Sequence, residues 1–169
     1  MAAIDKSLYE KFEIENVDRS RTVDIKGGVV SFNYYEDVFS PMKTARIVVA
    51  NTGNVIEGDD GKLQSIYNGL PLRGGERIII KIAGNSLENE GLEIEDFYVG
   101  SITDVMIDEQ RESFVLNLIS REAITNETVR VGKRFPASQK ISDSVKDICK
   151  NYLSSDKLKD VDETQNPYG

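Results

Sequence analysis

The segments Val29-Val-Ser-Phe-Asn-Tyr-Tyr35 and Met42-Lys-Thr-Ala-Arg-Ile-Val-Val-Ala50 decide the fold class, because both alternate between two kinds of side chain. A period of two residues, with β-branched and aromatic residues on one side, is typical of half-buried β-strands. The connector between the two segments is short, so we expect an antiparallel pair. The inward positions predicted from the alternation are Val30, Phe32, Tyr34, Ala45, Ile47 and Val49.

Further short strands are predicted on both sides of this pair, at residues 11–15, 22–25, 77–82, 97–107 and 113–120, with polar turns between them. The run Arg77-Ile-Ile-Ile-Lys-Ile82 is almost continuously apolar, which is typical of a strand covered on both faces or lying in a close assembly. Short strands in this number predict a mainly β fold. We expect an antiparallel two-sheet sandwich or a partly open barrel.

The hydrophobic period changes after Lys140, where apolar residues follow the i, i+4, i+7, i+8 spacing of an amphipathic helix. We expect one helix over about residues 143–153, with Val145 and Ile148 buried. Cys149 is the only cysteine, which excludes an internal disulfide, and its place on the apolar stripe favours a small core residue over a reactive thiol. The expected division is a β-domain at residues 1–130, then a linker, the helix and the start of a second domain at residues 131–169. We expect that second domain to continue past Gly169.

Composition narrows the range of functions. The chain has 169 residues, with 29 acidic against 21 basic side chains and a net charge of −8. Nucleic-acid binding needs clustered Lys and Arg, so tight binding to a phosphate backbone is not expected. The sequence contains no histidine, which removes Ser-His-Asp arrangements, zinc sites with His ligands and the commonest general base.

Two acidic segments remain as candidates for chemistry. Glu93, Glu95 and Asp96 precede a predicted strand and would be the carboxylates of a hydrolase, the leading alternative reading. The loop Glu57-Gly-Asp-Asp-Gly61 offers oxygen atoms that suit calcium, but it lacks the alternating ligands and the final Glu of an EF-hand, so a simple turn is favoured. A general protein-interaction module is the third reading.

In its order of segments the chain resembles the N-terminal part of the baseplate hub protein of T4-like contractile-tailed phages, including cyanophages. The resemblance runs from about Val23 to Leu153. The segments that carry it are Lys43-Thr-Ala-Arg-Ile-Val-Val-Ala-Asn51, Leu70-Pro-Leu-Arg-Gly-Gly-Glu-Arg-Ile-Ile-Ile80, Leu116-Asn-Leu-Ile-Ser120, Ala123-Ile-Thr-Asn126, Phe135 and Ser144-Val-Lys-Asp-Ile148.

The resemblance implies a β-domain of the tail-tube type, built of two packed sheets. It also implies a structural, non-enzymatic protein of the virion, assembled in the host cytoplasm, with no cofactor and no catalytic residue. In this family three hub subunits, each with two such domains, form a ring that joins the tail tube to the central spike and lets DNA pass. The implied partners are therefore other copies of the chain, the spike protein and the tube proteins, without membrane insertion.

Three positions are predicted to lie at contacts between subunits. Tyr35 and Val48 fall on the strand faces opposite the predicted core. Ile79 lies in a run that is more apolar than expected for a strand with one face exposed to solvent. A tube subunit covers such outward positions with its neighbours.

Overall fold

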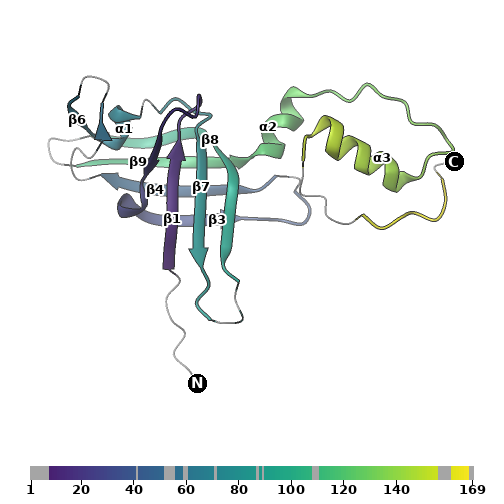
Figure 1. Ribbon diagram of the computed structural model, residues 1–169, viewed down its shortest axis with the longest axis horizontal. Coiled ribbons are helices and arrows are strands. Elements are labelled where there is room, and N and C mark those ends of the chain that lie inside the picture. Colours follow the sequence, from purple (N-terminus) through teal and green to yellow (C-terminus); the bar gives the residue numbers. More distant parts are fainter. Residues whose placement is uncertain are drawn as a thin grey trace. The chain divides into compact units, whose positions relative to one another are not determined.

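The computed structural model describes residues 8–40, 42–51, 56–58, 61–70, 72–86, 88, 90–107, 111–155 and 161–167. The chain divides into two compact units, Met1–Ser120 and Arg121–Gly169, and each is described by itself. The first unit is built mainly of strands, and the regular elements of the second are helices (Figure 1). The prediction of a mainly β protein with helical structure near its C-terminus is confirmed.

One antiparallel sheet makes up most of the first unit, in the order β2-β1-β7-β8-β9-β4-β3. A small hairpin of β5 and β6 forms a second sheet. The predicted pairing of β3 with β4 and the predicted hairpin of β8 and β9 are both present. The elements of this unit are β1 (Leu8–Glu15), β2 (Thr22–Asp24), the 3-10 turn η1 (Lys26–Gly28), β3 (Val29–Tyr35), β4 (Thr44–Asn51), β5 (Ile56–Glu57), β6 (Leu63–Gln64), α1 (Ile66–Gly69), β7 (Arg77–Ala83), β8 (Leu92–Ile107) and β9 (Glu112–Ser120).

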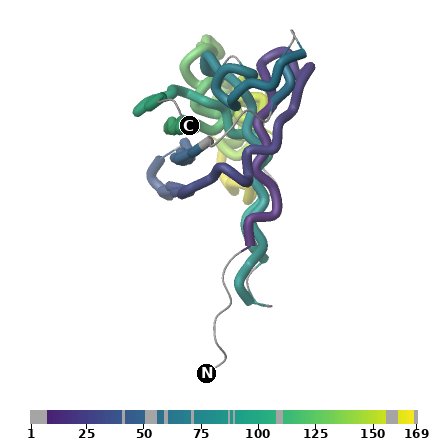
Figure 2. Tube along the Cα trace, turned by 90° about the vertical axis from the view of Figure 1, so that its left-hand side faces the viewer, coloured from purple at the N-terminus to yellow at the C-terminus, as the bar shows by residue number. Residues whose placement is uncertain are grey.

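The large sheet curls until its two ends meet. Phe12 of β1 and Phe32 of β3 come from opposite ends of the strand order, yet their ring centroids lie 5.5 Å apart in an edge-to-face contact. Gly28 fits closely against β4, because a Cβ at this position would lie 2.7 Å from the carbonyl oxygen of Ala50. Figure 1 shows β1 and β7 crossing in front of β4 and β9, and Figure 2 shows β1 running alongside β7. The fold is therefore the partly open barrel of the two predicted alternatives.

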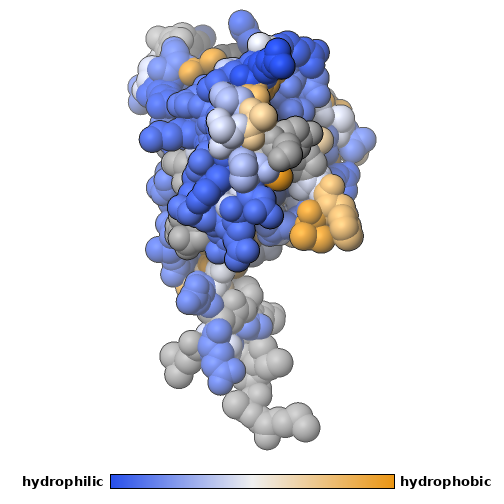
Figure 3. Space-filling view, turned by 90° about the vertical axis from the view of Figure 1, so that its right-hand side faces the viewer, coloured by the Kyte–Doolittle hydropathy of each residue, from blue (hydrophilic) through white to orange (hydrophobic). Residues whose placement is uncertain are grey.

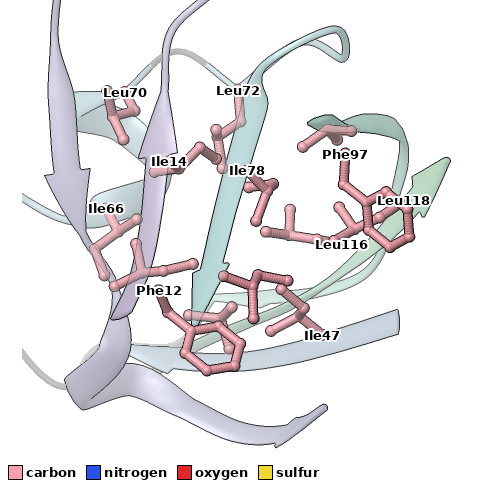
Figure 4. Close-up of a cluster of buried hydrophobic side chains, with 14 of the residues drawn as sticks. Phe12, Ile14, Ile47, Ile66, Leu70, Leu72, Ile78, Phe97, Leu116 and Leu118 are labelled. Carbon is pink, nitrogen blue, oxygen red and sulfur yellow. The ribbon is translucent and has the colours of Figure 1, made fainter. Parts of the chain in front are cut away.

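Apolar side chains fill the inside of this half-barrel. Figure 4 shows Phe12, Ile14 and Ile78 from the crossing strands lying close to Ile47, Leu116 and Leu118 from β4 and β9. Burial of this many large side chains is the main source of stability for such a domain. The buried cluster consists of Phe12, Ile14, Ile25, Ala45, Ile47, Val49, Ile56, Ile66, Leu70, Leu72, Ile78, Ile80, Ile94, Phe97, Val99, Phe114, Leu116 and Leu118.

The predicted alternation holds along β4 but breaks in β3. Ala45, Ile47 and Val49 are buried as predicted. The prediction for Val30 is wrong, because its side chain is 65% exposed. The register of β3 against β4 shifts between Val29 and Ser31, so Val30 is an extra residue without a partner on β4. Such a bulge takes the extra residue out of the alternation of the strand. From Phe32 onwards the predicted phase returns, and Phe32 and Tyr34 pack, half-buried, against the core.

Strands β7 and β8 also differ from expectation in detail. Ile78 and Ile80 are buried, whereas Ile79 is half-buried on the opposite face, so β7 is covered more fully on one side than on the other. Strand β8 begins at Leu92, five residues before the predicted start at Phe97, so Glu93, Glu95 and Asp96 lie inside the strand rather than before it.

The second unit contains α2 (Arg121–Thr128), α3 (Ile141–Asp147) and the π-helical turn η2 (Ile148–Tyr152). The predicted helix is present, but its predicted burial is wrong: Val145 is 38% exposed, and Ile148 and Cys149 are only half-buried. The face that is covered instead carries Ser142, which is 2% exposed and exchanges hydrogen bonds with Thr164.

Helix α2 was not predicted, because it has no apolar stripe. Ala123 is its one buried residue. Thr125 and Thr128 donate their hydroxyl groups to carbonyl oxygens of the preceding turn, which satisfies these side chains within the helix itself.

Candidate subunit interface

The outer face of β3, β4, β9 and β8 carries three rows of side chains that run across the strands. Residues directly opposite one another in neighbouring strands share a face, so the strand register defines each row. The rows are Tyr35–Thr44–Ile119–Tyr98, then Asn33–Arg46–Asn117–Ser101, and last Ser31–Val48–Val115–Thr103.

The first row is aromatic and aliphatic. Tyr35 is 56% exposed and lies opposite Thr44, which in turn lies opposite Ile119 of β9. Tyr98 continues the row on β8 and is half-buried like Ile119. Tyrosine combines a large apolar ring with a polar end, which explains why it is frequent at protein–protein contacts.

The middle row is polar. The amide nitrogen of Asn117 donates to the hydroxyl oxygens of Ser101, at 3.2 Å, and Thr103, at 3.1 Å. Arg46 forms an ion pair with Asp104, with 3.5 Å between Nη2 and Oδ2. Both members are largely exposed, so the pair adds little to stability but leaves a charge of each sign on the face.

The third row has two valines at its centre, between Ser31 and Thr103. Val48 is half-buried and lies opposite Val115, which is buried although it points away from the core. The structure therefore places Tyr35 and Val48 on one surface, as predicted from the alternation of their strands.

Ile79 does not belong to this surface. It lies on β7, three strands from β4 in the sheet order, and its partner on β1 is Glu13. The sequence identified it by the apolar run alone, which gives no information on where in the sheet the strand lies.

A group of three side chains fixes the end of β3. Tyr34 donates its hydroxyl to Glu36 at 2.7 Å, and the ammonium of Lys43 lies 2.8 Å from the same carboxylate. Burial raises the pKa of Tyr34, and the hydrogen bond to Glu36 adds to this rise. That carboxylate also raises the pKa of Lys43. The link joins the two strands at the base of their connector.

The connector presents an apolar tip that sequence reasoning missed. Val38 is 90% exposed and Phe39 is 93% exposed. Asp37 holds the turn, since its carbonyl accepts from the Ser40 amide at 3.0 Å and its carboxylate accepts from the Phe39 amide at 2.9 Å. The available signal was a pair of large apolar residues inside a segment otherwise built of turn residues.

The acidic segments lie in other parts of the first unit. Glu93 and Glu95 are exposed on β8, and the Glu95 carboxylate lies 3.9 Å from Nη2 of Arg77. Glu57 and Gly58 begin a tight hairpin in which Gly61 has φ +71°, while Asp59 and Asp60 lie outside the described residues. Among the residues that the structure describes, no three His, Cys, Asp or Glu side chains are grouped closely enough to hold a metal ion.

Comparison with known proteins adds no family: no family model matches any part of the chain. No curated protein matches its sequence either. Within the described ranges, no helix has both the length and the apolar character that crossing a membrane requires.

Proposed function

We propose that this protein is a structural subunit of a phage tail baseplate hub, which associates with copies of itself to form a ring between the tail tube and the central spike. Its partners are other copies of the chain, the spike protein and the tube proteins. It acts in the virion, lets DNA pass without binding it specifically, and catalyses no reaction.

The observation that carries this proposal is the outer face of β3, β4, β9 and β8. A row containing Tyr35, Ile119 and Tyr98 and a row with Val48 and Val115 at its centre flank a polar row on a continuous hydrogen-bonded sheet. Apolar contact area combined with a few fixed charges is typical of specific protein–protein contacts. The order of segments that resembles the hub family supports the same assignment.

A test of this face is the size of the assembly in solution. A hub contact should bury on the order of 1,000 Å² or more, so the unaltered protein should form oligomers whose population rises with concentration in analytical ultracentrifugation. Tyr35→Glu and Val48→Glu should each weaken the association, because each places a charge in an apolar row. Leu63→Glu is a matched control, since Leu63 is 61% exposed on β6, outside the large sheet.

A strictly monomeric protein at every concentration would refute the assembly function. Oligomers that respond equally to all three variants would refute this face as the contact. The hydrolase alternative is tested separately: turnover of peptidoglycan fragments that disappears in Glu95→Gln would replace the structural role by an enzymatic one.

A further inference from the structure

The two ends of the large sheet differ in how their edges are covered. At one end, the short β2 and η1 cover β1, since the Ile25 amide donates to the Phe12 carbonyl at 2.8 Å and Lys26 Nζ donates to the Glu10 carbonyl at 3.4 Å. At the other end, β3 pairs with β4 alone. Its seven residues contain no proline and no charge, the usual devices that keep a sheet edge from pairing further. The edge strand at the first end, β2, has only three residues and ends at the charged Asp24, so the long open edge without such protection is β3.

The second unit contains a segment outside any helix or strand, whose backbone could pair with such an edge. Residues 130–136 (Arg-Val-Gly-Lys-Arg-Phe-Pro) form neither helix nor strand, and all of them except Phe135 are exposed. Among the described residues, no backbone hydrogen bond involves Arg130 to Phe135. Backbone groups that lack a protein partner can pair with an open sheet edge.

The charges of the two elements are complementary. The segment carries Arg130 and Arg134, together with Lys133, which forms an ion pair with Asp147. Strand β3 is itself uncharged; Glu36, which follows it, is paired with Lys43, and Asp37 comes next. A basic strand laid along β3 would bring its arginines toward the carboxylate of Asp37, whereas an acidic strand in the same place would be repelled.

The side-chain pattern is complementary as well. If residues 130–136 are extended, Val131, Lys133 and Phe135 point to one face and Arg130 and Arg134 to the other. On the core side, Val131 and Phe135 would cover Phe32 and Tyr34, which the first unit leaves half-buried, and the long side chain of Lys133 would lie between them with its ammonium directed to solvent. On the outer side, an arginine would lie beside the exposed ring of Tyr35, a favourable cation–π arrangement.

We propose that residues 130–136 of one copy add as a strand to the open edge of β3 in a second copy. This inference rests on the self-association proposed above and names a backbone contact for it. The contact joins two different surfaces, so each copy both donates a segment and accepts one, and repetition of the contact closes a ring when the rotation permits. The face of the protein that Figure 3 shows is mainly hydrophilic, with small apolar patches. Hydrogen bonds between backbone groups fix the direction and register of a contact, which small apolar patches do not.

Charge at the edge provides the first test. Asn33 is exposed on β3 and makes no contact with the core, so its substitution should leave the fold intact. Because Asn33 also belongs to the middle row of the outer face, opposite effects of a basic and an acidic residue, and not a loss of association alone, are the evidence for strand addition. Asn33→Lys should weaken association on the order of tenfold, because it repels the basic segment, whereas Asn33→Glu should strengthen it. Equal effects of the two variants in analytical ultracentrifugation would overturn the inference.

A proline scan tests for a strand. Successive amide groups of a strand point to opposite sides, and an edge strand tolerates proline only where the amide points away from its neighbour. Of Val131→Pro and Gly132→Pro, one should abolish association and the other should leave it nearly unchanged. If both variants behave alike, residues 130–136 do not pair as a strand.

Mixing separates this inference from the proposed function. Arg130→Glu with Arg134→Glu weakens the donated segment and Asn33→Lys weakens the accepting edge, so each chain alone should associate on the order of tenfold more weakly than the wild type, while their mixture, which pairs an intact segment with an intact edge, should form one-to-one dimers more tightly than either chain associates alone. Wild-type oligomers that ignore these substitutions would overturn the strand addition and leave the hub function standing.

A wild-type chain that stays monomeric would refute the proposed hub function. In that case, binding of a synthetic peptide of residues 129–136 tests whether the segment adds to the edge of β3. Titrated into that monomer, the peptide should shift the amide resonances of Ser31 to Tyr35, and a peptide carrying glutamate in place of Arg130 and Arg134 should not. Absence of these shifts would overturn the inference.

Discussion

Removing the ring of Phe12 should open the half-barrel where its two ends meet. Phe12 is fully buried, and its ring lies 4.9 Å from that of Tyr9 and 5.5 Å from that of Phe32. Because β1 and β3 share no ladder of hydrogen bonds, side-chain packing joins these two strands. Phe12→Ala removes the central member of this contact.

The expected cost follows from the burial. Truncation of a fully buried Phe to Ala costs about 3–5 kcal/mol, a large part of the 5–15 kcal/mol typical of a domain. Phe32→Ala should cost less, because Phe32 is half-buried. The double variant should cost less than the sum of the two, with a coupling of about 0.5–1.5 kcal/mol for an edge-to-face aromatic pair.

Urea unfolding followed by far-ultraviolet circular dichroism measures these free energies. Phe39→Ala is the matched control: the substitution is the same, but Phe39 is 93% exposed, so its cost should stay within about 0.5 kcal/mol. A loss below about 1 kcal/mol for Phe12→Ala, or a coupling near zero, would show that the ends of the sheet are not held together by this packing.

Three further predictions test other parts of the chain. Gly28→Ala should cost about 1–3 kcal/mol in the same urea experiment, because its Cβ would lie 2.7 Å from the carbonyl oxygen of Ala50; an unchanged midpoint would contradict this close fit. Ile148→Ala should cost about 1 kcal/mol, below the ~2–5 kcal/mol of a core position, because Ile148 is half-buried; a larger loss in thermal unfolding would mean that a partner covers the helix. The hydrogen bond from Lys133 lowers the pKa of Asp147 below its ordinary value of 3.8, so its contribution to stability is present above that pH and lost as the pH falls through the lowered pKa. Asp147→Asn should therefore reduce the acid sensitivity of unfolding, and equal pH profiles for the two proteins would contradict this linkage.

Sequence patterns predicted this fold best where local and global preferences agree. The alternation of β4 gave the correct inward residues because the strand lies between two partners and keeps a regular ladder with both. The alternation of β3 failed at Val30, since a bulge depends on how the strand meets its neighbour and leaves no mark on the period. The two predicted architectures were distinguished by the contact of Phe12 with Phe32, a long-range packing that no local pattern contains.

Helix α3 shows a different limit. Its apolar stripe was identified correctly, but the step from stripe to burial assumed that a neighbouring element exists to cover it. The segment of residues 161–167 packs on the side of Ser142 instead, through Thr164. Amphipathic spacing predicts a helix and its apolar face, whereas the residue that covers this face has to be supplied by the rest of the fold.

Strand alternation also predicted which face two of the three candidate interface residues occupy, while their role at a subunit contact stays a prediction. Tyr35 and Val48 were placed by strand alternation, which also governs the cross-strand rows, and so they share a face. The arrangement of these rows is relevant to assembly, because Arg46 of the middle row forms an ion pair with Asp104, which follows Thr103 of the third row. A partner that covers both the row of Tyr35 and the row of Val48 must also desolvate this ion pair, which costs free energy unless the partner offers matching charges. Apolar area thus favours contact between subunits in general. The ion pair on the same face favours one alignment of the two subunits over alternatives shifted along the strands, and a ring of identical subunits requires such a single alignment.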